Sequence, residues 1–210
     1  MLLDFNDSRQ ILDSYQLPLV DSRVISTDQE LDQAVEELGL PVVMKIDAQD
    51  PDTAHKTDLG GVKVGLTDQE QARQALNELQ ALGDHQVVIQ KQIAGEEMIV
   101  GGRQDEVFGP IVMVGLGGVL VEIYQDIVFR LAPIDQSEAH RMIDEIRGRK
   151  ILEGYRGRQT VNKDQLAEII TQTSKLLSDN QHIKELDLNP VMGFDELFIC
   201  DVKIFVCDHS

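Results

Sequence analysis

Three oxygen-bearing side chains near the end of the chain have the spacing of a divalent-cation site. Asp187 and Asn189 are two residues apart, so both face the same side if this segment is a strand. Asp201 interrupts the apolar run 197–202, and an antiparallel hairpin would bring it opposite Asn189. Carboxylate and amide oxygens are ligands that Mg²⁺ prefers, so the trio predicts a magnesium site that could bridge phosphates. The alternative is a proline turn with ordinary acids at a sheet edge.

A glycine-containing loop predicts phosphate binding. Gly60 and Gly61 allow the backbone to approach an anion with no Cβ in the way, and successive amides form an anion-binding concavity. Lys56 and Lys63 add positive charge on either side of the glycines. His55 stands at the edge of the loop, and its neutral imidazole could accept a phosphoryl group. The alternatives are a β-hairpin turn and a solvated histidine.

Two cations interrupt apolar strands. Lys45 lies in the run 42–46, where a buried amine without a partner would be costly. It could hold a nucleotide phosphate, or alternation could place it on a solvent-exposed face. Arg130 lies in the run 127–133, and its guanidinium could bind a phosphate or a carboxylate with two hydrogen bonds. A structural ion pair, with Glu122 for example, is the alternative for Arg130.

A hinge between two lobes is expected near residue 91, where an apolar strand ends. The backbone of Gln90, Lys91 and Ile93 could read the edge of an adenine there. Glu97 begins the next predicted strand and could accept hydrogen bonds from ribose hydroxyls. These residues add an adenosine site to the predicted phosphate and metal groups.

The composition is that of a soluble globular protein of 210 residues, with 42% hydrophobic and 27% charged residues. The net charge of −18 argues against nucleic acid as a partner, because phosphates would be repelled, although a local site around the glycines can still be positive. No apolar run is long enough to span a membrane, and the acidic N-terminus does not resemble a signal peptide. We therefore expect a cytoplasmic protein. Cys200 and Cys207 fit neither a zinc knuckle nor a redox pair and are expected to be structural thiols.

The elements that must position these side chains alternate between helix and strand, with frequent hairpins. Two capping boxes, at 27–30 and 67–70, are expected to open helices. Two strands are expected around Asn189 and Pro190 within 184–206. This pattern predicts a mixed α/β (α+β) fold with two lobes, residues 1–91 and residues 92–210.

These residues, in this order, resemble the ATP-grasp fold, and more narrowly the nucleotide-binding subunit or domain of the NDP-forming acyl-CoA synthetases. The similarity covers nearly the entire chain. Five ordered motifs carry it: Pro41–Lys45, His55–Lys63, Phe108–Gly118, Phe129–Pro133 and Glu185–Pro190.

The resemblance implies a Mg-ATP or Mg-ADP site between two lobes. In it Lys45 would touch phosphate, Glu97 would meet the ribose, and Asp187, Asn189 and Asp201 would hold Mg²⁺. His55 would match a phosphohistidine of the ADP-forming acetyl-CoA synthetases. Lys91 departs from the pattern, since the family often has Glu there.

Two functions are compatible with this resemblance. The first is the ATP-grasp part of an ADP-forming acyl-CoA synthetase, which needs a CoA-binding subunit or domain because nothing in this sequence resembles one. The alternative is a nucleotide-binding regulatory domain of a bacterial protein lysine acetyltransferase. A carboxylate–amine ligase of the same fold is a weaker match, because the histidine motif has no use there.

Overall fold

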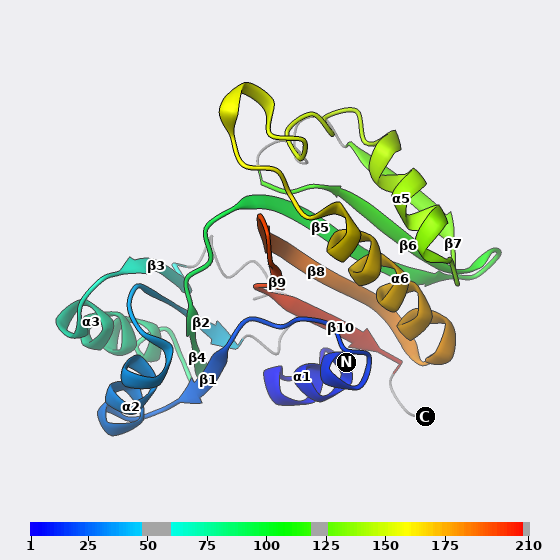
Figure 1. Cartoon of the computed structure of the whole chain (residues 1–210). Coiled ribbons are helices and arrows are strands. Elements are labelled where there is room, and N and C mark those ends of the chain that lie inside the picture. Colours follow the sequence, from blue (N-terminus) through cyan, green and yellow to red (C-terminus); the bar gives the residue numbers. More distant parts are fainter. Residues whose placement is uncertain (48–59, 119–125, 208–210) are drawn as a thin grey trace. The chain divides into compact units, whose positions relative to one another are not determined.

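The computed structural model describes residues 1–47, 60–118 and 126–207. The chain forms two compact units (Figure 1). The small unit consists of Val20–Gln92 with Leu2, and the large unit of Leu3–Leu19 and Ile93–Ser210 with Met1. The sequence predicted lobes of residues 1–91 and 92–210, but the structure places Leu3–Leu19 in the large unit. The reason is that helix α1 (Phe5–Ser14) packs against strand β10 (Val202–Val206), and the segment before it donates a hydrogen bond from Leu3 N to the carbonyl of Ile204 at 3.0 Å.

The small unit is an antiparallel sheet of four strands covered on one face by two helices. The strand order is β1-β4-β2-β3, for β1 (Ser22–Ile25), β4 (Gln86–Lys91), β2 (Val42–Asp47) and β3 (Val62–Leu66). Val42, Met44 and Ile46 of β2 are buried in one core with helices α2 (Asp28–Leu38) and α3 (Gln69–Gln80). Because side chains alternate along a strand, the residues between them face the other side of the sheet.

The two helices of the small unit begin at side-chain caps. Thr27 forms the predicted capping box with Glu30 at the start of α2. At α3 the cap is Asp68 rather than Thr67, since the Asp68 carboxylate accepts from Gln71 N at 2.8 Å. Helix α3 therefore begins one residue later than the predicted capping box at 67–70 implied.

The large unit is built on a six-stranded sheet in the order β10-β8-β5-β6-β7, with β9 paired to β8. Helices α5 (Gln136–Glu145) and α6 (Lys163–Asp179) cover one face of this sheet (Figure 1). The strands besides β10 are β5 (Glu96–Asp105), β6 (Gly109–Leu116), β7 (Ile127–Leu131), β8 (Ile183–Gly193) and β9 (Leu197–Ile199).

Strand β8 carries the predicted metal motif and differs from the prediction in its extent. It is 11 residues long and runs through Asn189 and Pro190. The segment that follows it forms two short strands, β9 and β10, where the sequence predicted one. Leu186 and Leu188 of β8 are buried in the core that α6 completes. Their neighbours along the strand therefore lie on the face of the sheet opposite α6. Among the described residues, no helix combines the length and apolar character needed to cross a bilayer.

Candidate functional site

Lys45 is a buried cation in the central strand region of the small unit. It lies in β2 between β3 and β4, opposite Val62 and Val88, and is only 5% exposed. Its side chain lies on the face away from α2 and α3, because Met44 and Ile46 face the helices. Gln90 of β4, also 5% exposed, lies on the same face opposite Val43. The sequence predicted phosphate binding by Lys45 and an adenine contact from the backbone near Gln90, and the structure places both residues on this face.

Lys63 is on the other face of that sheet. Its ammonium forms an ion pair with Glu78 of α3 at 2.5 Å, and this hydrogen bond lowers the pKa of the Glu78 carboxyl. Lys63 therefore does not accompany Lys45, and the structure supports a structural role for it instead of the predicted phosphate contact. Gly60 has a φ of +69°, and the Gly61 carbonyl accepts from Ile46 N at 3.0 Å. Gly61 thus continues the pairing of β2 and β3, and Gly60 lies in the turn before it.

Two backbone N–H groups of the predicted hinge form hydrogen bonds within the small unit. Lys91 N donates to the carbonyl of Asp21 at 3.0 Å, and Gln92 N donates to the carbonyl of Pro41 at 3.1 Å. Ile93 N donates to no acceptor among the described residues, so it is the hinge N–H available to an adenine edge in that part of the chain. Lys91 is exposed.

Glu97 is the second residue of β5, and two glycines that follow β6 lie against it. Gly117 N donates to the Glu97 carbonyl at 2.6 Å. A Cβ on Gly117 would lie 2.8 Å from the Glu97 carbonyl carbon, and one on Gly118 would lie 2.9 Å from the Glu97 Oε2 atom. The sequence showed this glycine cluster without assigning it a role; its role here is to let the backbone lie against Glu97.

The predicted metal trio is brought together on one face of the large sheet. Asn189 N donates to the Asp201 carbonyl at 3.2 Å, so the predicted pairing of these residues is present. Asp187 lies opposite Lys203 of β10 and opposite Gly101 of β5. Val202 and Ile204 are in the core, so Asp201 lies on the same face as Asp187.

Asp187 is a buried carboxylate whose charge Lys203 offsets only in part. Burial raises its pKa to about 6, Lys203 opposes this effect, and the nearby Asp201 and Glu185 carboxylates add to it. The Asp187 Oδ1 atom is buried and has no hydrogen-bond partner among the described residues. It lines a groove of about 350 Å³ together with Met113 and Phe129. An unpartnered carboxylate oxygen beside an amide and a second carboxylate fits a divalent cation, although the described part of the chain contains no group of three His, Cys, Asp or Glu side chains disposed for a metal.

Arg130 is on the helix-covered face of the large sheet, opposite to the metal trio. Its guanidinium bonds Glu138 at 2.6 Å and Glu145 at 2.5 Å, both on α5. Glu145 and then Glu138 raise the pKa of Arg130. The structure therefore realises the ion-pair alternative, with these partners, and does not bring Arg130 to Asp187. His55, Lys56 and Glu122 lie outside the described residues.

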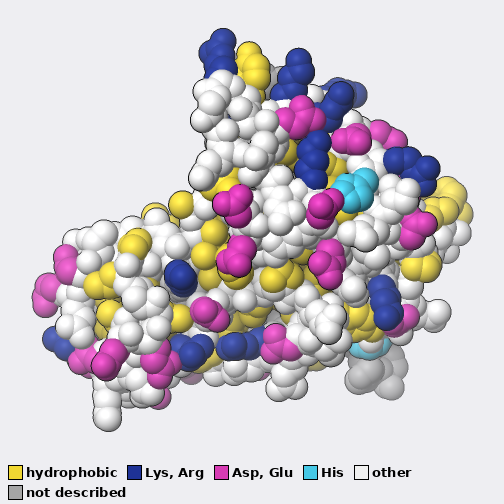
Figure 2. All heavy atoms as spheres, viewed as in Figure 1, with side chains coloured by type: hydrophobic (Ala, Val, Ile, Leu, Met, Phe, Trp, Pro, Cys, Tyr) yellow, Lys and Arg dark blue, Asp and Glu magenta, His cyan; other side chains and the backbone are white. Residues whose placement is uncertain are grey.

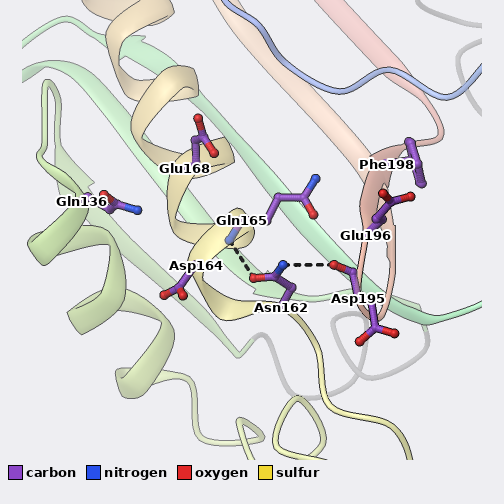
Figure 3. Close-up of a pocket in the computed structure, with 8 residues that line it drawn as sticks. All are labelled: Gln136, Asn162, Asp164, Gln165, Glu168, Asp195, Glu196 and Phe198. Carbon is purple, nitrogen blue, oxygen red and sulfur yellow. Dashed lines mark hydrogen bonds between the residues drawn. The ribbon is translucent and has the colours of Figure 1, made fainter.

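A second hollow in the large unit contains none of the predicted site residues (Figure 3). It has a volume of about 700 Å³ and lies between the start of α6 and the β8–β9 turn. Asn162 links its walls: Nδ2 donates to the Asp195 carbonyl at 3.0 Å, while Oδ1 accepts from Gln165 N at 3.1 Å (Figure 3). Four of its lining residues are acidic, which disfavours phosphate there. They are Asp164, Glu168, Asp195 and Glu196.

Residues 1–206 match the family described as ATP-grasp domain. The chain belongs to this family. The ATP-grasp chain is 38% identical over 199 residues to acetate–CoA ligase (ADP-forming) I subunit beta of Pyrococcus furiosus, a match that covers 90% of the chain and 85% of that subunit. It is 36% identical over 210 residues to 4-hydroxybutyrate–CoA ligase (ADP-forming) of Nitrosopumilus maritimus, where it covers 94% of the chain but spans only 30% of the relative.

A solved structure gives the same relationship in three dimensions. Dinucleotide-forming acetyl-coenzyme A synthetase 1 of Ca. Korarchaeum cryptofilum, in complex with coenzyme A and Ca-AMPCP, superimposes with a TM-score of 0.91 at 32% identity, covering 98% of the ATP-grasp chain and 93% of the solved one. The same protein with Mg-AMPPCP gives a TM-score of 0.83 at 33% identity, covering 98% and 92%.

These findings confirm the predicted mixed α/β ATP-grasp fold. They also confirm that the chain is the ATP-grasp part of an ADP-forming acyl-CoA synthetase. The alternative, a regulatory domain of a protein lysine acetyltransferase, is not supported by these relatives.

Proposed function

We propose that this chain binds an adenine nucleotide with Mg²⁺ and moves a phosphoryl group between the nucleotide and His55, in concert with a CoA-binding subunit or domain. The observation that carries the proposal is the convergence of Asp187, Asn189 and Asp201 on one sheet face, with a buried carboxylate oxygen that has no partner among the described residues. The names of the relatives support it. One is subunit beta of an ADP-forming ligase, and the Korarchaeum enzyme was solved with Mg-AMPPCP and a phosphohistidine segment pointing towards the nucleotide site.

Different residues of the chain would contact the phosphates, the adenine and the ribose of the nucleotide. Lys45, buried in β2, would place a positive charge on a phosphate, with Lys56 and the amides near Gly60 and Gly61 adding donors. Ile93 N would donate to the adenine edge, with Gln90 and Lys91 beside it, and Glu97 would accept from ribose hydroxyls.

The metal trio would supply charge neutralisation. Asp187, Asn189 and Asp201 would hold Mg²⁺, which when bound offsets the negative charge of the phosphates. The pKa of about 6 for Asp187 means that its carboxylate is mostly ionised at neutral pH and available as a ligand.

The transfer itself needs positioning more than covalent assistance from other residues. In the direction of ATP formation, a β-phosphate oxygen of ADP forms a P–O bond to the phosphoryl group on His55. The N–P bond breaks, and its electron pair returns to the imidazole nitrogen. In the reverse direction the imidazole nitrogen attacks the γ-phosphorus of ATP, and ADP leaves.

Phosphoryl labelling tests this function. Incubation with ATP labelled in the γ-phosphate should give acid-labile label on the wild-type chain and none on His55→Ala. His182→Ala removes an exposed histidine far from the predicted motif in sequence and should label normally. Calorimetric titration with ADP, with and without Mg²⁺, measures binding independently. Equal labelling of His55→Ala would exclude the histidine from the reaction, and absence of nucleotide binding would contradict the proposal as a whole.

A further inference from the structure

Strand β9 is three residues long, and the predicted metal ligand Asp201 follows it by two residues. Cys200 N donates to the carbonyl of Pro190 in β8 at 2.8 Å. Because backbone groups alternate in direction along an antiparallel strand, Leu197 and Ile199 direct their N–H and C=O groups to the outer edge, away from β8. The position of β9, and of Asp201 after it, therefore depends on the groups that bond this outer edge.

Gln165 of α6 bonds one half of the outer edge. Its Nε2 atom donates to the Leu197 carbonyl at 2.9 Å, and its Oε1 atom accepts from Leu197 N at 2.8 Å. A single side chain thus bonds both backbone groups of Leu197, as a neighbouring strand would. Figure 3 shows the Gln165 amide extending from the first turn of α6 toward the β8–β9 hairpin. The carbonyl of Pro18 bonds the other half, accepting from Ile199 N at 2.8 Å.

The first turn of α6 is itself fixed against this hairpin. Asn162 N donates to the Phe194 carbonyl at 2.7 Å, and Asn162 Nδ2 donates to the Asp195 carbonyl at 3.0 Å. Leu166, the next residue after Gln165, is fully buried in the core of the large unit. Gln165 therefore holds β9 from a rigid helix, which fixes a side chain more precisely than a loop would.

Asp201 depends on β9 for its place beside the other predicted metal ligands. Its carbonyl accepts from Asn189 N at 3.2 Å, and it lies on the same sheet face as Asp187. A shift of β9 would move Asp201 relative to both residues. Mg²⁺ demands ligand oxygens at about 2.0–2.1 Å in near-octahedral geometry. Replacement of residues that orient metal ligands commonly lowers metal affinity by about 10–100-fold.

The surroundings of Gln165 disfavour a direct contact with the nucleotide. Gln165 lines the hollow of about 700 Å³ that also contains four carboxylates. Figure 2 shows acidic side chains, in magenta, over the start of α6 and the β8–β9 turn. Carboxylates repel phosphates, and α6 covers the sheet face opposite to Asp187. An effect of Gln165 on the magnesium site would therefore pass through β9.

Resting on the proposed function, we propose that Gln165 is a positioning residue for the magnesium site. It holds β9 through Leu197 and thereby sets Asp201 against Asn189. The amide suits this role because it carries both a donor and an acceptor, whereas an ionised carboxylate carries acceptors only.

Three variants separate this role from a general contribution to stability. Gln165→Leu removes both bonds to Leu197 and keeps a side chain of similar size. Gln165→Glu keeps an acceptor for Leu197 N but, when ionised, offers no donor to the Leu197 carbonyl. Gln104→Leu is the matched control. Gln104 is also half-buried, and its Nε2 atom donates to the Leu177 carbonyl at 2.7 Å, which joins β5 to α6 away from β9.

Amide hydrogen exchange followed by NMR measures the hold on β9 without any metal or nucleotide. The N–H groups of Ile199 and Cys200, just before Asp201, should exchange at least about tenfold faster in Gln165→Leu than in the wild-type chain. Gln165→Glu should give an intermediate increase, and Gln104→Leu should stay within about twofold of wild type. Equal exchange in the wild-type chain and Gln165→Leu would show that the side chain does not hold β9.

Calorimetric titration of Mg²⁺ into the chain with ADP measures the effect on the metal site. The Kd for Mg²⁺ should rise about tenfold in Gln165→Leu and stay within about twofold in Gln104→Leu, while ADP binding without Mg²⁺ is the same in all variants. An unchanged Mg²⁺ Kd in Gln165→Leu, or an equal rise in the control, would overturn the positioning role. Absence of Mg²⁺ binding by the wild-type chain would contradict the proposed function and the role in metal binding with it, and the exchange rates would still decide whether Gln165 holds β9.

Discussion

Asp187 of β8 and Lys203 of β10 lie directly opposite each other in the sheet, yet the pKa of Asp187 is raised to about 6. Burial of the carboxylate is the main cause, and the Asp201 and Glu185 carboxylates add to it. The lysine therefore does not balance the negative charge on this face. A face that gathers carboxylates in excess of cations is unfavourable for the protein alone and favourable once a cation binds.

The Asp187 pKa predicts a specific pH dependence of stability. The ordinary pKa of 3.8 applies to the unfolded chain, so between about pH 4 and 6 the folded state holds a proton that the unfolded state has released. The contribution of Asp187 is therefore fully present below pH 4 and is lost as the pH rises to 6. Its upper limit is about 3 kcal/mol, from a shift of about two pKa units.

Asp187→Asn removes this titration. We expect the variant to gain up to about 2–3 kcal/mol over the wild-type protein at pH 7 and little at pH 4, measured by urea unfolding across this range. Asp195→Asn, at an exposed position, should change neither value. A constant difference between Asp187→Asn and wild type at all pH values would show that the carboxyl is not perturbed.

Substitution of Lys45 and of Lys63 should have different effects on nucleotide affinity. Lys45→Met should weaken nucleotide binding at least about tenfold, because the lost cation lies on the face with Gln90 and charge-assisted bonds to phosphate are strong. Lys63→Met should leave the nucleotide Kd nearly unchanged, because its partner is Glu78 on the helix-covered face. Calorimetry with Mg-ADP measures both, and similar losses in the two variants would contradict the assignment of the two lysines to opposite faces.

The sequence predicted the parts of this molecule that depend on local pattern. Strand β2 and the cap at Thr27 follow from alternation and from one capping box, and the pairing of Asn189 with Asp201 follows from strand periodicity and a hairpin of suitable length. Each of these features is determined by residues that are close in sequence or by a simple turn.

Features that depend on distant contacts were not predictable in the same way. Nothing local in Leu3–Leu19 shows that α1 packs against β10, which is almost 190 residues away in the chain. The role of Arg130 depends on its partners Glu138 and Glu145 in α5. Alternation along its strand could not show which side of the sheet that helix covers. The support of Glu97 by Gly117 requires a close backbone approach that only the folded sheet defines.

Gly117 should be sensitive to the addition of a single methyl group. A Cβ there would lie 2.8 Å from the Glu97 carbonyl carbon, so Gly117→Ala must push the backbone at residue 117 away from Glu97 of β5. We expect a loss of about 1–3 kcal/mol in stability and weaker ADP binding. Gly109→Asn is the control, because nothing lies near that position and Asn tolerates its φ of +77°. Unchanged stability and binding in Gly117→Ala would show that Glu97 can move without consequence.

Arg130 should behave as a structural residue. Its guanidinium joins β7 to α5 through Glu138 and Glu145, so Arg130→Met should lower the Tm by about 2–4 °C and leave the Kd for Mg-ADP within about twofold. Glu138→Gln removes one partner and should lower the Tm by a similar or smaller amount. The double variant should lose less stability than the two single variants together, because both substitutions remove the same interaction. Thermal unfolding and calorimetry on the same samples separate the two roles. A large loss of nucleotide affinity in Arg130→Met, with an unchanged Tm, would instead place the guanidinium in contact with phosphate and require α5 to release it.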